Sequence, residues 1–180
     1  MRHPEYPVEP PQFIAESDLL RDAYELARSS HHGPARRGDT DIDHPLAVAE
    51  LLHEYGFDEQ VIAAALLHDV VEDTALDLAS IAEQFGGEIS SLVAEMTEDP
   101  GIEAYEERKA EHRLRVARDR RVAAIYAADK LAKARGLRSA DEVPGEQLEH
   151  YRQTLTLLCE TYPDLPFLGE LREELEALLT

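Results

Sequence analysis

The chain has 180 residues, enough for one domain with a sizeable core, and it carries 38 acidic against 18 basic side chains, a formal net charge of −20. Such a charge repels nucleic acid and anionic lipid, so we expect neither as a partner. No stretch approaches the roughly 18 apolar residues of a membrane span. A single cysteine, Cys159, excludes a disulfide framework within the chain and suits a reducing cytoplasm, where we expect the protein to act.

Helical periodicity dominates the sequence and no convincing strand alternation interrupts it, so we predict an all-α fold. Residues 1–16 are rich in proline and charge and are expected to form a flexible arm. Residues 17–180 are expected to form one domain, a bundle of about eight to nine short helices. In chain order these helices begin near residues 17, 44, 59, 77, 88, 103, 120, 144 and 168.

Local signals mark several helix ends. Asp58 and Asp77 can cap the helices that follow them, because a carboxylate there accepts a backbone N–H of the first turn. Pro144 suits the start of a helix, where its missing N–H needs no partner. Gly56 and Gly136 are expected to end helices, since glycine readily adopts the left-handed conformation found there.

Basic residues are concentrated in one part of the chain, because eleven of the eighteen fall between Gly101 and Ala140. Two interpretations are open. In the first interpretation, these residues lie on solvated helix faces and form salt bridges with the many acidic side chains. Alternatively, some of them form a local basic region that holds a small anionic substrate against the overall negative field.

The most informative segment is the apolar run from Val61 to Leu67, which ends in His68 and Asp69. Such a run belongs in a core, where an imidazole and a carboxylate are costly unless they are paired or bind a cation. Glu72 and Asp73 come four residues later, so on one continuous helix His68 stacks above Glu72 and Asp69 above Asp73. One imidazole and three carboxylates that converge in this way indicate a metal ion.

Two further residues complete a candidate ligand set. His44 stands at the start of the second helix, and Asp129 ends the apolar segment 122–128. With His68 and Asp69 they provide two imidazoles and two carboxylates, which suit Mn²⁺, Fe²⁺, Co²⁺ or Zn²⁺. We expect one such divalent ion, which would activate water and polarise a phosphoryl oxygen.

The order of the motifs resembles that of HD-domain metal-dependent phosphohydrolases, most closely the hydrolase domain of RelA/SpoT-type (p)ppGpp enzymes and their small stand-alone relatives. The resemblance covers most of the chain, to Arg138. It implies that the four candidate ligands hold a single Mn²⁺ and that Glu72 and Asp73 orient and deprotonate the attacking water. It also implies hydrolysis of a phosphate or pyrophosphate ester of a small metabolite, a nucleotide. The motifs that carry it are His44-Pro45, Leu66 to Thr74, and Ala127 to Leu131.

Three positions differ from the usual pattern of (p)ppGpp hydrolases. Thr40-Asp41-Ile42 replaces a Pro-Tyr-Ile segment, Tyr126 replaces a lysine and Lys133 replaces an asparagine. The resemblance places the last two positions around the nucleotide and its phosphates, so the substrate stays open between (p)ppGpp and another nucleotide. The candidate phosphate-binding residues are Arg28, Arg36 or Arg37, Lys130 and Lys133.

Two other functions fit the same residues. The chain could bind a nucleotide as a regulatory module without turnover, or its His and Asp residues could form structural ion pairs in a helical protein. A two-metal oxygenase is disfavoured, because it needs extra histidines between the His-Asp pair and the final Asp, where only His112 lies. The amphipathic first and last helices leave a homodimer open.

Overall fold

The structure, a computed structural model, describes residues 9–31, 42–140 and 143–179. Within these ranges it consists of eleven helices and contains no strand, which confirms the all-α prediction. Two of the helices, α1 and α5, have only four residues each and account for the excess over the predicted number. The helices are α1 (Gln12–Ala15), α2 (Asp18–His31), α3 (Asp43–Glu54), α4 (Glu59–Leu67), α5 (Val70–Asp73), α6 (Leu78–Phe85), α7 (Gly87–Met96), α8 (Tyr105–Val116), α9 (Arg120–Leu137), α10 (Gly145–Thr161) and α11 (Leu168–Ala177).

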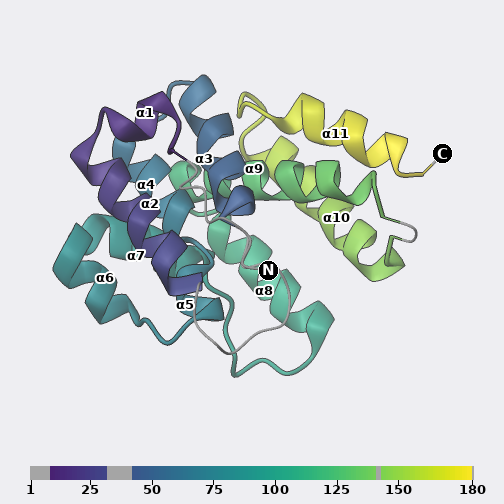
Figure 1. Ribbon diagram of the computed structural model, residues 1–180. Coiled ribbons are helices and arrows are strands. Elements are labelled where there is room, and N and C mark those ends of the chain that lie inside the picture. Colours follow the sequence, from purple (N-terminus) through teal and green to yellow (C-terminus); the bar gives the residue numbers. More distant parts are fainter. Residues whose placement is uncertain (1–8, 32–41, 141–142, 180) are drawn as a thin grey trace, which may run out of the picture.

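Helix α9 runs through the centre of the molecule (Figure 1). It contacts α3, α4, α7, α8, α10 and α11. Its residues 122–131 are all buried, because a helix surrounded by neighbours can be apolar on every side. Asp129 and Lys130 are the two charged residues of this buried stretch, so the central helix carries two opposite charges into the core.

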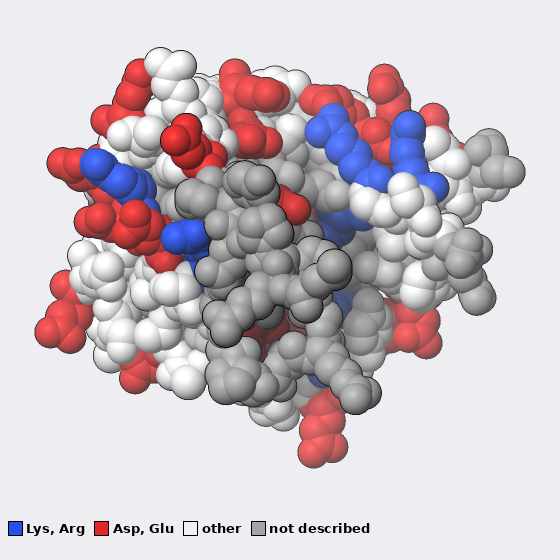
Figure 2. Space-filling view, viewed as in Figure 1, with Lys and Arg blue, Asp and Glu red and all other residues white. Residues whose placement is uncertain are grey.

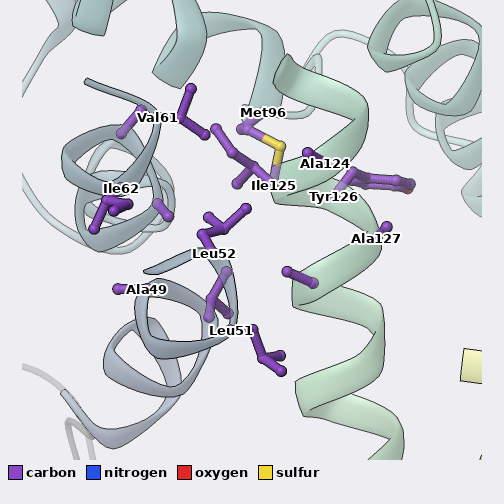
Figure 3. Close-up of a cluster of buried hydrophobic side chains, with 14 of the residues drawn as sticks. Ala49, Leu51, Leu52, Val61, Ile62, Met96, Ala124, Ile125, Tyr126 and Ala127 are labelled. Carbon is purple, nitrogen blue, oxygen red and sulfur yellow. The ribbon is translucent and has the colours of Figure 1, made fainter. Parts of the chain in front are cut away.

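The main core lies where α3, α4 and α7 meet α9 (Figure 3). Ile125 points from α9 towards Leu52 and Val61, and Met96 lies beside it (Figure 3). Tyr126, the next residue, points to the opposite side of α9 (Figure 3). Helix α9 therefore separates an aliphatic core on one side from aromatic and charged side chains on the other.

The apolar faces of the first and last long helices are covered within the chain. Helix α2 packs against α4, and α11 packs against α9 and α10. Leu20 and Ala23 of α2 and Leu171 and Leu175 of α11 are buried by these contacts. The amphipathicity that left a homodimer open is thus explained by packing inside the domain.

Two of the predicted caps and one predicted stop have the expected geometry. A carboxylate oxygen of Asp58 accepts the N–H of Val61 at 3.0 Å, and Asp77 accepts the N–H of Ser80 at 2.9 Å. Gly56 follows α3 with a φ of 75°, the left-handed conformation that favours glycine. The stop at Gly56 and the cap at Asp58 set the residue at which α4 begins. They thereby set where the buried C-terminal end of α4 lies.

The prediction that Gly136 ends its helix is wrong, because α9 continues to Leu137. Glycine inside a helix costs about 1 kcal/mol relative to alanine. Packing offsets that cost here: Leu137 packs against the core. Arg135 and Arg138, on either side of the glycine, form ion pairs with glutamates of α11.

The predicted N-terminal arm contains α1. Ile14 is fully buried, and the ring of Phe13 stacks on the ring of His53 with centroids 4.2 Å apart. These two apolar side chains attach residues 12–15 to the domain. Residues 1–8, the first half of the predicted arm, lie outside the described residues.

Acidic side chains are spread over the face shown in Figure 2, with few basic side chains among them. Nine of the eleven basic residues between Gly101 and Ala140 form ion pairs with carboxylates, which favours the salt-bridge interpretation of that segment. Among the helices described, none is long and apolar enough to cross a membrane.

Candidate metal centre

The four predicted ligands come from three places in the fold. His44 lies in the first turn of α3, His68 and Asp69 connect α4 to α5, and Asp129 lies on α9. Because α9 packs on both α3 and α4, residues far apart in the sequence meet at one end of the core.

The prediction that one continuous helix carries His68 to Asp73 is wrong. Helix α4 ends at Leu67, and a separate short helix, α5, begins at Val70. His68 Nδ1 lies 2.7 Å from the carbonyl oxygen of Ala65, so the imidazole donates to one of the last carbonyls of α4 and is held at the helix end. Glu72 and Asp73 therefore lie on a helix of their own.

The structure brings the four predicted ligands together. Ligand atoms of His44, His68 and Asp129 all lie within 4.8 Å of one another. Oδ1 of Asp129 is 2.9 Å from His44 Nε2 and 3.4 Å from His68 Nε2. Asp69 Oδ1 is 3.1 Å from His68 Nε2, and its Oδ2 is 3.9 Å from His44 Nε2. His44, His68 and Asp129 thus form a cluster that could hold a metal ion, and Asp69 adjoins it through its contacts with both histidines.

The chemistry of His68 fits a metal ion. Because Nδ1 donates to a carbonyl, a deprotonated Nε2 presents its lone pair to a cation, which is the arrangement that outer contacts impose on metal-binding histidines. Nε2 is buried and forms no hydrogen bond within the described part of the chain. Burial opposes protonation, yet the carboxylates of Asp69 and Asp129 raise the pKa of His68 to about 10. The site thus has a strong preference for positive charge at Nε2.

Asp129 is held on both carboxylate oxygens. Lys130 Nζ donates to Oδ2 at 2.6 Å, and Lys133 Nζ lies 2.9 Å from Oδ1. Burial alone would raise the pKa of Asp129, but the charges of Lys130 and Lys133 hold it well below its usual range. Asp129 is therefore ionised and able to bind a cation.

Glu72 and Asp73, the predicted proton acceptors, are both exposed on α5. Glu72 Oε1 accepts the backbone N–H of Glu98, which follows α7. Partial desolvation of the carboxyl group raises the pKa of Glu72, the hydrogen bond from the backbone of Glu98 opposes this rise, and the nearby carboxylates of Glu98 and Asp69 add to it. A carboxylate with a raised pKa is better matched to proton transfer near neutral pH than an ordinary one.

The predicted phosphate-binding residues differ in their positions. Lys133 lies at the edge of the centre, whereas Lys130 is buried beneath it. Arg28 is exposed on α2 and lines an open depression whose other residues are Asp22, Glu25, Leu26, Ser29 and Gln84. Arg36 and Arg37 lie outside the described residues, as do Thr40 and Asp41.

Sequence reasoning missed the contacts that surround the ligands. Glu98 has no motif around it, and only the fold shows that it holds Glu72. His150 was without a role in the sequence, yet its Nε2 lies 3.2 Å from the hydroxyl of Tyr126 in the core. The departure at Tyr126 was visible in the sequence, but its partners from α8 and α10 were not.

Comparison with known proteins places these features in a family. A model of the HD domain matches residues 23–158, which include all four candidate ligands. The chain belongs to the HD-domain family. This confirms the family predicted from the motifs. The family alone implies a divalent metal, and the donor set described above fits one.

Curated relatives of this HD domain are much longer proteins of the RelA/SpoT type. It is 38% identical to a probable GTP pyrophosphokinase of Mycobacterium leprae over 150 residues, which cover 81% of this chain and 19% of that protein. It is 37% identical to a guanosine-3′,5′-bis(diphosphate) 3′-pyrophosphohydrolase of Aquifex aeolicus over 119 residues, 64% of this chain and 17% of that protein. It is 32% identical to the bifunctional (p)ppGpp synthase/hydrolase SpoT of Escherichia coli over 145 residues, 77% and 20% of the two chains. The chain spans about a fifth of the length of these relatives.

Solved structures of smaller proteins match nearly end to end. A metazoan ortholog of SpoT that hydrolyses ppGpp superposes with a TM-score of 0.73 at 25% identity, covering 89% of this chain and 95% of that one. A Listeria monocytogenes protein superposes with a TM-score of 0.69 at 29% identity, covering 80% and 100%. The helical fold is therefore shared with both structures over most of this chain.

Proposed function

We propose that this HD domain is a metal-dependent phosphohydrolase that cleaves a phosphate or pyrophosphate ester of a nucleotide. The observation that carries the proposal is the cluster of His44, His68 and Asp129, in which the buried Nε2 of His68 has no hydrogen bond and also lies 3.1 Å from Asp69 Oδ1. The relatives named for (p)ppGpp hydrolysis make the 3′-pyrophosphate of that nucleotide the first substrate to test.

We infer that His44, His68, Asp69 and Asp129 hold one divalent ion and that Mn²⁺ is the preferred one. Two nitrogen and two oxygen donors without a thiolate suit Mn²⁺, with Fe²⁺, Co²⁺ and Zn²⁺ as alternatives. When bound, the ion would polarise a phosphoryl oxygen and acidify water at the site.

Side chains of the protein accept the proton of the attacking water and bind the phosphate group of the substrate. Hydrolysis forms a bond between phosphorus and the oxygen of the attacking water and breaks the bond from phosphorus to the leaving oxygen. Glu72 accepts the proton of that water, with Asp73 beside it on α5 as a second acceptor. The leaving oxygen regains a proton from solvent. Lys133, whose side chain is 37% exposed at the edge of the centre, binds the phosphate oxygens of the substrate together with Arg28 or Arg36.

A release assay tests the proposal. Purified chain, stripped with chelator and reloaded with Mn²⁺, is incubated with a panel of nucleotides that includes ppGpp, and released phosphate and pyrophosphate are measured. We expect release that needs Mn²⁺ and falls by more than about a hundredfold in Asp69→Asn, because the variant loses an anionic ligand.

The matched control is Asp164→Asn, which removes an exposed carboxylate that pairs with Arg120 far along the chain. It should retain the activity of the parent chain. Metal-loaded protein that releases nothing from any nucleotide would contradict the proposal. Tight nucleotide binding without release would indicate a regulatory module instead, and a chain that takes up no metal would indicate structural ion pairs.

A further inference from the structure

Lys130 is predicted from the sequence to bind the substrate, but its surroundings are those of an interior residue. It is 6% exposed, and its Nζ donates to Asp129 Oδ2 at 2.6 Å. Lys133, one turn further along α9, has a side chain that is 37% exposed and lies 2.9 Å from the other oxygen, Oδ1. The two lysines therefore contact the same carboxylate from different sides, one from the core and one from the surface.

Two aromatic rings enclose the buried ammonium group. Lys130 Nζ lies 4.2 Å from the ring centroid of Tyr126 and 5.6 Å from that of Tyr151 on α10. Both distances are within the range of a cation–π interaction. The hydroxyl of Tyr151 in turn accepts a hydrogen bond of 2.8 Å from Gln147. A carboxylate and two rings thus fix the position of Nζ and offset the cost of burying its charge.

The ring of Tyr126 is itself held by α8 and α10. Arg113 Nη1 lies 2.6 Å from His150 Nδ1, and an arginine can only donate, so Nδ1 must accept. The proton of His150 therefore resides on Nε2, which donates to the hydroxyl oxygen of Tyr126 at 3.2 Å. A chain of directed contacts runs from Arg113 through His150 and Tyr126 to the ammonium group of Lys130.

We propose that Lys130 is a positioning residue of the metal centre. It binds Asp129 through Oδ2 and so keeps Oδ1 directed at His44 and His68, and it makes no contact with the substrate. Outer contacts of this kind commonly control metal affinity by about 10- to 100-fold. The inference rests on the proposed function, because the property that Lys130 controls is the affinity of the centre for its ion.

Metal binding of the full chain tests this role separately from activity. Chelator-stripped protein is titrated with Mn²⁺ in a calorimeter for the parent chain, Lys130→Met and Lys130→Arg, and each variant is melted by circular dichroism. We expect Lys130→Met to fold and to bind Mn²⁺ about 10- to 100-fold more weakly. Lys130→Arg, which keeps the charge, should recover part of the loss.

Lys133→Met is the matched control, since it removes the same charge from the same carboxylate on the exposed side. We expect its Mn²⁺ affinity to be unchanged or tighter, because Lys133 competes for Oδ1, the oxygen that faces the imidazoles. Equal losses in both variants would show a general charge effect and would overturn the positioning role. So would parent-like Mn²⁺ affinity in Lys130→Met with a raised KM alone, which is the behaviour of a substrate-binding residue.

Three further outcomes are decisive. If Lys130→Met does not fold, Tyr151→Leu tests the same chain of contacts, because it removes one ring beside Nζ and leaves the charge. For Tyr151→Leu we expect a loss of about three- to tenfold in Mn²⁺ affinity. No loss in this variant would overturn the inference. If the parent chain binds no Mn²⁺ at all, the proposed function fails and this inference fails with it. Binding by the parent with no effect in either variant defeats this inference alone.

Discussion

At the scale of single residues, His68 shows how much a local pattern can predict. An imidazole directly after a fully apolar run indicated a paired or metal-bound side chain, and the structure places its Nε2 among carboxylates without a hydrogen bond in the described ranges. Lys130 shows the limit. Lysine is almost always exposed, so nothing in the sequence distinguished the buried Lys130 from the half-buried Lys133.

Glu72 gives the prediction that belongs to this scale. Its pKa is raised by partial burial, and a base works only when deprotonated, so activity should fall as the pH drops through a value above that of an ordinary glutamate. Glu72→Gln should lower kcat by about 10²- to 10⁴-fold and abolish this acid limb, with little change in Mn²⁺ affinity. The measurement is a pH–rate profile of both proteins with (p)ppGpp or the substrate found by the release assay. An unchanged acid limb in the variant would assign the proton to another group, with Asp73 as the first to test.

At the scale of elements, the sequence predicted the helices with clear caps and missed the breaks. Asp58 and the apolar run correctly predicted α4, but nothing signals that the chain turns at His68 and Asp69, because the bond from the imidazole to Ala65 depends on the finished fold. The prediction that α9 ends at Gly136 failed for the opposite reason. Because α9 packs against α11, the helix continues past a residue that usually ends one. Tertiary contacts decided both positions.

The segment between α7 and α8 is a second element that only the structure explains. Glu98 pairs with Arg108 at 2.8 Å and also with Lys109, and Arg115 donates to the carbonyl oxygen of Thr97 at 2.7 Å. These contacts hold Thr97 and Glu98 against α8. The backbone N–H of Glu98 in turn donates to the carboxylate of Glu72. Through Glu98, helix α8 thereby helps to position the carboxylate of Glu72, the proposed proton acceptor.

Glu98→Gln tests this fastening through its pH dependence. His112, Lys109 and Arg108 hold the pKa of Glu98 well below its usual range, so the carboxylate stabilises the fold above the ordinary glutamate pKa and loses that effect as the pH falls towards its own lower value. We expect the variant to be less stable by about 1 to 3 kcal/mol at pH 7 and by less at pH 3. Urea unfolding at the two pH values measures the difference, with Glu83→Gln on the exposed side of α6 as a control that should change little. A loss that is the same at both pH values would contradict the electrostatic explanation.

At the scale of the whole molecule, a net charge of −20 surrounds a centre that needs a cation. The field of the surface attracts divalent ions in general, and it repels a phosphorylated substrate until positive charge is present at the centre. Composition predicted this field and the all-α class, and the motifs predicted the family. The substrate was not predictable, because it depends on how side chains from different helices are placed around the ion, and sequence order alone does not fix such distances.

The central claim is that His44, His68, Asp69 and Asp129 hold one divalent ion. Diffraction from crystals grown with Mn²⁺, recorded at the manganese absorption edge, tests it most directly. We expect one strong anomalous peak per chain, within direct coordination distance of Nε2 of both histidines and of an oxygen of each aspartate. A strong peak bound only by carboxylates elsewhere on the acidic surface, or none between these four side chains at saturating Mn²⁺, would contradict it.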